Sequence, residues 1–175
     1  MNVLLGITGG IAAYKTPELV RHLRKRGHAV RCVLTANGAR LVARDALAAV
    51  SGAPVAMDLW PEDGRMDHID LARWADRLVI APATANALAH LRLGLADDLL
   101  TTLALAFEPS RPRFLAPAMN TVMWNQPAVQ EHLAVLLQRG WRCIGPVAGD
   151  LACGEQGVGA MTAPEAIAEA VSDGA

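Results

Sequence analysis

Residues 2–34 read NVLLGITGGIAAYKTPELVRHLRKRGHAVRCVL. The run Asn2–Ile7 is short and apolar, which is typical of a buried strand, and the glycines after it predict a turn. Ile11–Arg26 has the spacing of an amphipathic helix, in which Pro17 marks a kink or a local restart. A glycine then stops this helix, and Ala29–Leu34 is a second strand. A strand, a helix and a strand at this spacing predict a right-handed βαβ unit with parallel strands.

The same alternation of strand and helix continues along the chain. Further strands are expected at Arg77–Ala81, Arg113–Ala116 and Trp141–Ile144, with a weaker one at Val55–Leu59. Further helices are expected at Ala39–Val50, Ala85–Leu91, Asp97–Phe107, Gln126–Arg139 and Pro164–Val171. Short apolar strands between amphipathic helices predict an α/β fold: a doubly wound parallel sheet, Rossmann or flavodoxin-like, with helices on both faces. No repeat, low-complexity tract or linker divides the chain, so one domain over residues 1–175 is expected.

Composition and charge limit the classes of protein to consider. Of the 175 residues, 53% are hydrophobic and 19% are charged, which indicates a large core or apolar surface buried against copies of the chain. The net charge is −1, and the one basic run, residues 21–26, lies at the end of a predicted helix, so nothing favours nucleic-acid binding. No segment has the length and apolar character of a membrane span, and the first residues lack the features of a signal peptide.

Two loops at the ends of the first two strands are candidates for a phosphate site. Gly9 and Gly10 follow the first strand and precede a helix, where small residues let a phosphate approach backbone N–H groups. Thr35 follows the second strand, and ligands of open α/β sheets bind beyond the carboxyl ends of the strands. The glycines match neither the G-x-G-x-x-G fingerprint nor a P-loop, so a tight turn required only by the fold is the alternative.

Two later loops carry amide and hydroxyl side chains. Thr84 and Asn86 follow a predicted strand and open a helix, where they are either helix caps or hydrogen-bonding partners for the edge of a planar heterocycle. Met119 and Asn120 follow another strand, in the stretch PAMNTVMW. This stretch offers a polar clamp within an apolar wall that suits a flat ring.

A histidine and a cysteine are candidates for proton transfer. His68 lies just before an amphipathic turn and a strand; imidazoles exchange protons near neutral pH, although a lone histidine is more often a surface or hydrogen-bonded residue. Cys153 lies in the glycine-rich stretch 149–161, which is either a flexible lid or irregular structure, and exposure there would make it reactive.

The three cysteines show no metal-ligand spacing, so we expect no metal site. Their small, odd number suits a reducing, cytoplasmic setting. Cys32 and Cys143 are expected to be buried apolar residues.

Taken in order, these segments resemble the homo-oligomeric flavin-containing cysteine decarboxylases over nearly the whole chain. Three stretches carry the resemblance: HIDLARWAD (68–76), PATAN (82–86) and PAMNTVMW (117–124). Each could occur by chance, but three in sequence at suitable spacing are specific. The family includes phosphopantothenoylcysteine decarboxylases of coenzyme A biosynthesis and peptide decarboxylases that act on a C-terminal cysteine.

The resemblance implies a role for each matching position. FMN would be bound by Gly9, Gly10 and Thr35 at its phosphate and by Thr84, Asn86 and Met119 at its ring. Asn120 would bind the substrate carboxylate, and His68 would be the catalytic base. The active sites of the family lie between subunits, so a homotrimer or a dodecamer built of trimers is expected.

The chemistry expected of such a family follows from the substrate. An N-acylated cysteine cannot form a Schiff base, whereas oxidation of its thiol by FMN to a thioaldehyde lets the electrons left by CO2 delocalise onto sulfur, giving an enethiol. The resemblance implies that Cys153, in ACGE (152–155), helps to return a proton so that the enethiol becomes a thiol. On that residue, the expected reaction is conversion of 4′-phosphopantothenoylcysteine to 4′-phosphopantetheine.

Two alternatives remain open at this point. Many bacterial coenzyme A enzymes fuse this domain to a synthetase domain, and no synthetase domain follows Ala175 in this sequence. This observation favours the first alternative, oxidative decarboxylation of the C-terminal cysteine of a ribosomally made peptide to an aminoenethiol. The other alternative is a non-catalytic flavin-binding regulatory subunit. The joint presence of His68, Asn120 and Cys153 argues against this second alternative.

Overall fold

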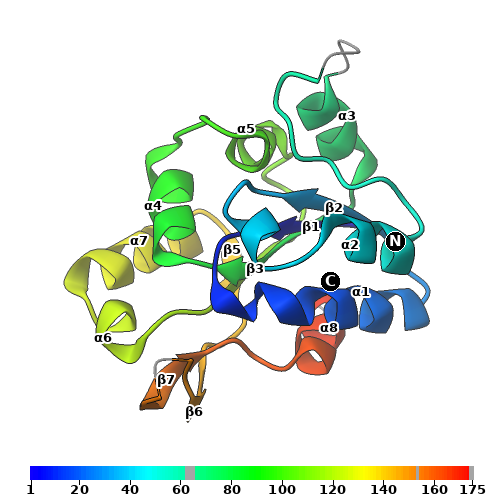
Figure 1. Cartoon of the computed structure of the whole chain (residues 1–175). Coiled ribbons are helices and arrows are strands. Elements are labelled where there is room, and N and C mark those ends of the chain that lie inside the picture. Colours follow the sequence, from blue (N-terminus) through cyan, green and yellow to red (C-terminus); the bar gives the residue numbers. More distant parts are fainter. Residues whose placement is uncertain (62–65, 153, 174–175) are drawn as a thin grey trace.

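The computed structural model describes residues 1–61, 66–152 and 154–173. Its strands are β1 (Asn2–Ile7), β2 (Ala29–Leu34), β3 (Arg77–Ala83), β4 (Arg113–Pro117), β5 (Trp141–Cys143), β6 (Val147–Asp150) and β7 (Gln156–Ala160). Its helices are η1 (Ile11–Lys15), α1 (Thr16–Lys25), η2 (Gly38–Arg40), α2 (Arg44–Ser51), α3 (Asp67–Trp74), α4 (Ala85–Leu93), α5 (Leu99–Ala106), α6 (Thr121–Trp124), α7 (Pro127–Gln138) and α8 (Pro164–Asp173). The strands β1 to β5 form one parallel sheet in the order β2-β1-β3-β4-β5, and β6 and β7 form a separate antiparallel hairpin (Figure 1).

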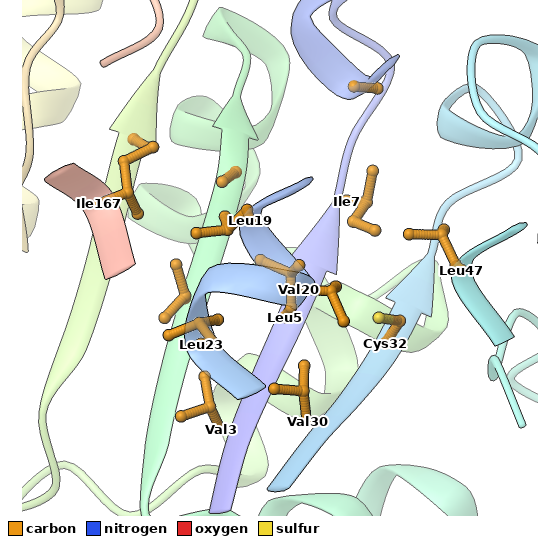
Figure 2. Packing of buried hydrophobic residues seen from close by; sticks show 14 of the residues in the cluster. Val3, Leu5, Ile7, Leu19, Val20, Leu23, Val30, Cys32, Leu47 and Ile167 are labelled. Atoms are coloured by element: carbon orange, nitrogen blue, oxygen red, sulfur yellow. The ribbon is translucent and has the colours of Figure 1, made fainter. Parts of the chain in front are cut away.

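The sheet is covered on both faces by buried apolar side chains. On one face, Val3, Leu5 and Ile7 of β1 belong to a cluster that includes residues of α1, α2 and α8 (Figure 2). On the other face, Leu4 belongs to a cluster with residues of α3, α4, α5 and α7. A strand whose side chains are buried on both faces of the sheet is the middle layer of a three-layer sandwich. The prediction of a doubly wound parallel α/β sheet with helices on both faces is confirmed.

The N-terminal βαβ unit follows the sequence closely. The strands β1 and β2 have the predicted bounds, and they pair in parallel from Asn2 with Ala29 to Ile7 with Leu34. The predicted helix is divided into the 3-10 turn η1 and the α-helix α1, and Pro17 lies in the first turn of α1. Proline suits that position because the first turn leaves its N–H groups without helical partners. The local restart is therefore the correct interpretation of Pro17.

Two predicted elements are wrong in part. The strand expected at Val55–Leu59 is reduced to a single parallel bridge between Ala56 and Val33 at the edge of the sheet. The helix expected at Ala39–Val50 is interrupted, because Ala43 is extended (ψ 132°) and separates η2 from α2.

Three elements lie where the sequence indicates a turn, a loop or irregular structure. Helix α3 occupies the place of the amphipathic turn around His68, and the one-turn helix α6 follows Asn120. For the stretch 149–161 the alternatives are a flexible lid and irregular structure, and irregular structure is wrong for the residues of β6 and β7, which pair there as a hairpin. Within residues 1–61, 66–152 and 154–173, no helix combines the length and apolar character needed to cross a membrane.

Candidate functional site

A cavity of about 750 Å³ opens at the carboxyl ends of β1, β3 and β4. In the order β2-β1-β3-β4-β5, the chain leaves β1 toward β2 and leaves β3 toward β4, so the connections from β1 and β3 run in opposite directions. They open a crevice at this edge of the sheet, which is the usual ligand site of such folds. Most of the predicted binding residues line this cavity: Gly9, Gly10, Thr35, Thr84, Asn86, Met119 and Asn120. The topology thus brings together loops that are far apart in the sequence.

The turn at Gly9 and Gly10 packs closely against the loops that follow β2 and β3. A Cβ atom at Gly9 would collide with the Asn37 side chain. A Cβ atom at Gly10 would lie 3.1 Å from Cγ of Pro82 and 3.2 Å from Cγ2 of Thr84. Gly9 therefore has no room for a side chain and Gly10 has little, and the absence of side chains leaves the backbone open to a ligand.

The hydroxyl groups of Thr35 and Thr84 are both used in local structure. Oγ1 of Thr35 donates to the carbonyl of Ile7 and accepts from the backbone N–H of Gly38, each at 3.1 Å. Oγ1 of Thr84 accepts from the N–H of Ala87 at 3.2 Å and caps α4. The interpretation of Thr84 as a helix cap is confirmed, and both threonines shape the cavity wall in addition to lining it.

The amide oxygen and the amide nitrogen of Asn120 form hydrogen bonds with different partners. Its Oδ1 accepts from the backbone N–H groups of Val122 (2.8 Å) and Met123 (3.4 Å), which caps α6. Its Nδ2 donates to Oε2 of Glu155 at 2.8 Å. A flip of the amide would place N–H groups against the N–H groups of the helix, so the hydrogen-bond pattern fixes its orientation.

The β6–β7 hairpin forms one wall of the cavity through residues at its two ends, including Asp150, Ala152 and Ala160. Gly159 O accepts from Met119 N–H at 3.0 Å, and a Cβ atom at Gly157 would collide with the Thr121 side chain. The glycines of this stretch therefore allow close packing of β7 on the loop after β4. Cys153, the predicted proton donor, lies outside the described residues.

His68 is not among the residues that line the cavity. It lies in the first turn of α3, which Figure 1 shows far from α6 and the hairpin. Its Nδ1 atom is buried and has no hydrogen-bond partner among the described residues. Within one chain, the predicted base and Asn120 are therefore not brought together.

The cavity also contains charged and polar residues that the motifs do not indicate. Lys15 and His90 line it together with Asp98. His90 Nδ1 lies 3.1 Å from Oδ1 of Asp97, and Asp98 forms a capping box with Thr101 at the start of α5. Lys15 is the last residue of η1, the short helix that begins directly after the glycine turn, so its closeness to Gly9 and Gly10 in the sequence was the available signal. His90 gave none, because its place on α4 resembles any half-exposed helix position.

The two described cysteines are unsuited to catalysis. Burial raises the pKa of the Cys32 thiol to about 12 and that of Cys143 to about 11, so both remain protonated at neutral pH. Thiols are nucleophilic and exchange protons readily only when ionised or close to it. The interpretation of Cys32 as a buried apolar residue is confirmed, whereas Cys143 is only partly buried.

Comparison with known proteins relates this site to flavin enzymes. The Flavoprotein family profile matches residues 1–174. A Haemophilus influenzae protein described as coenzyme A biosynthesis bifunctional protein CoaBC is 48% identical over 174 residues, which are 98% of this chain and 43% of that protein. The chain thus spans less than half the length of this curated relative.

Two solved structures share the whole fold. A PPC decarboxylase variant in complex with pantothenoylaminoethenethiol has a TM-score of 0.87 and 37% identity, over 98% of this chain and 96% of that one. The FMN-dependent cysteine decarboxylase SpaF has a TM-score of 0.82 and 35% identity, over 98% and 95% of the two chains. The resemblance carried by the three sequence motifs is confirmed.

Proposed function

Because the chain belongs to the Flavoprotein family, we propose that it binds FMN and decarboxylates 4′-phosphopantothenoylcysteine to 4′-phosphopantetheine. The observation that carries this proposal is the single cavity in which the glycine turn, Thr84, Met119 and Asn120 meet. The likeness to a PPC decarboxylase over 96% of its chain and to a CoaBC protein at 48% identity supports the choice of substrate.

The described residues fit FMN. The cavity of about 750 Å³ lies within the range of about 300–1,000 Å³ typical of sites for small ligands. Gly9 and Gly10 offer the phosphate an approach to the backbone without side chains in the way, next to Thr35. Thr84, Asn86 and Met119 would lie at the flavin ring. The exposed Asn86 and the half-buried Met119 give this part of the wall one amide and one polarisable apolar side chain.

The residues of the chain would control position and protons in this reaction. Bound FMN would supply the oxidation of the substrate thiol and the later return of its electrons. Asn120 Nδ2 would donate to the substrate carboxylate and orient it for departure, since Oδ1 is held by the helix cap. His68 would take the proton of the thiol, and Cys153 would return a proton to the enethiol.

We propose a homotrimer or a dodecamer of trimers in the cytoplasm, in which a second copy of the chain would bring His68 to this site. Exposed apolar side chains support association: Trp60 is 80% exposed, Met66 before α3 is 59% exposed, and Leu105 on α5 is 60% exposed. Large exposed apolar side chains in one region are typical of interfaces between subunits. The free thiols of Cys32 and Cys143 suit a reducing compartment.

Oxidative decarboxylation of a peptide with a C-terminal cysteine is the second candidate function. The likeness to SpaF at 35% identity favours it. This candidate shares FMN, Asn120 and His68 with the first and differs in the fate of the enethiol, which would be released without reduction.

One experiment separates the two substrates. The purified protein is incubated anaerobically, with free FMN in excess as the electron acceptor, with 4′-phosphopantothenoylcysteine and, separately, with a peptide that ends in cysteine, and products are identified by mass spectrometry. We expect the first substrate to lose CO2 alone. Turnover of the peptide only, with loss of CO2 and two hydrogen atoms, would establish the second candidate, and no turnover of either would refute both.

The glycine turn provides a test of the cofactor site. We expect Gly10→Val to lower the FMN content per chain by at least about tenfold, because a β-branched side chain there would meet Pro82 and Thr84 at the cavity wall. Gly149→Ala is the matched control, since an added Cβ atom would lie at an ordinary 3.5 Å from Ala160. Flavin absorbance of the purified variants measures the effect, and equal FMN content in both would contradict the assignment of this turn.

A further inference from the structure

The amide nitrogen of Asn120 already holds a carboxylate that belongs to the chain itself. Glu155 approaches from the hairpin, and its Oε2 accepts from Asn120 Nδ2 at 2.8 Å. The amide oxygen accepts hydrogen bonds at the start of α6, and Nδ2 is the donor of this side chain, so Nδ2 is the end that can bind an anion. The group that would bind the substrate carboxylate is thus in contact with a carboxylate of the same chemical kind.

The fold brings Glu155 to this position by fixing the hairpin on both sides. Glu155 directly precedes β7, and its carbonyl accepts from Leu151 N–H at 2.8 Å, which closes the turn. Farther along β7, the carbonyl of Gly159 accepts a hydrogen bond from the backbone N–H of Met119, and Gly157 packs against Thr121. The start of β7 is therefore held beside the residue that follows Met119, although 35 positions separate Asn120 from Glu155.

We propose that Glu155 is a positioning residue that occupies the carboxylate subsite until substrate arrives. This inference rests on the proposed function, because it takes Asn120 as the partner of the substrate carboxylate. Two carboxylates at one amide repel each other, so substrate displaces Glu155 when its own carboxylate binds. Glu155 is exposed, so solvent lies next to its side chain when substrate displaces it.

The exchange has a consequence for the product. Loss of CO2 removes the substrate carboxylate that competes with Glu155 for Asn120. The carboxylate of Glu155 then returns to the amide, whether or not the rest of the product still lies in the cavity. Glu155 therefore weakens the binding of the acylcysteine substrate and leaves the binding of the decarboxylated product unchanged.

Glu155→Gln tests this exchange, because it keeps the size of the side chain and removes the charge. We expect the KM for the acylcysteine to fall about threefold with little change in kcat, since exposed charged contacts of this kind are weak. The inhibition constant of the decarboxylated product should stay at the wild-type value. Glu169→Gln, at an exposed position on α8, is the matched control for the loss of one charge.

The KM for the acylcysteine and the inhibition constant of the decarboxylated product together decide the outcome. An unchanged or higher KM in Glu155→Gln, or a shift of equal factor for substrate and product, would overturn the role proposed for Glu155. Glu155→Ala provides a second variant if the glutamine form does not fold, with FMN content and thermal midpoint as checks. Absence of decarboxylation by the wild-type protein would instead refute the proposed function, so the two failures are distinguishable.

Discussion

Replacement of His68 by asparagine should lower the rate of CO2 release by at least about a hundredfold, which is the usual contribution of a positioned general base. FMN should remain bound, because His68 does not line the cavity in which the cofactor residues meet. Asparagine retains a polar side chain of similar reach but does not take up a proton at neutral pH. The measurement is CO2 release with saturating substrate, next to flavin absorbance. Normal turnover by His68→Asn would show that the base lies elsewhere.

The separation of His68 from Asn120 makes a stronger test available. If a neighbouring copy supplies His68, a mixture of the inactive variants His68→Asn and Asn120→Asp, unfolded and reassembled together, should regain activity. Random pairing in a closed ring would restore about a quarter of the sites. Each variant reassembled alone is the control. A mixture as inactive as its components would contradict a site shared between subunits.

Replacement of Cys153 by serine should change the product rather than only the rate. Without the thiol, the enethiol would accumulate, and the product would lack CO2 and two hydrogen atoms instead of CO2 alone. A serine hydroxyl is far less acidic than a thiol and is a poor proton donor at this step. Cys153 itself lies outside the described residues, but its neighbour Ala152 lines the cavity. Mass spectrometry of the product measures the change.

Cys143→Ser is the matched control for this variant. Burial raises the pKa of Cys143 to about 11, and its Sγ donates to the carbonyl of Gly145 at 3.0 Å. Serine can make the same hydrogen bond, so we expect the Cys143→Ser product to be the fully reduced thiol. The same thiol from Cys153→Ser would remove the reductive role of Cys153 and leave the choice of substrate to the rest of the site.

The regular part of the fold could be predicted because its signals are local. The strands β1 and β2 are continuous apolar runs, and the helix between them shows its own period, its own proline and its own terminal glycine. These patterns reflect whether a segment is buried on one face or on two, and each strand or helix encodes that information within its own few residues. The prediction at Val55–Leu59 was wrong in part because this segment makes only one bridge to the edge strand β2. The prediction at Ala39–Val50 was wrong in part because the extended backbone at Ala43 interrupts the helix, which shows that local geometry can override propensity.

The same contrast applies to the candidate site. The motifs predicted the residues around the cavity, since each follows a strand whose carboxyl end must lie at one edge of a parallel sheet. They did not indicate His90 or the hairpin, whose positions depend on packing between distant segments. They also did not indicate the contact between Glu155 and Asn120, because a single glutamate in a glycine-rich stretch has no periodic signature.

The sequence by itself determined the doubly wound sheet, the family and the set of polar residues offered to a ligand, because these depend on patterns within short segments. Only the tertiary structure decided which of those residues meet. The order β2-β1-β3-β4-β5 and the hairpin that packs on Met119 bring Asn120 to Glu155, whereas His68 on α3 stays outside the cavity. The reason is physical: the distance between two side chains is set by how strands and helices pack, and no local pattern carries that information.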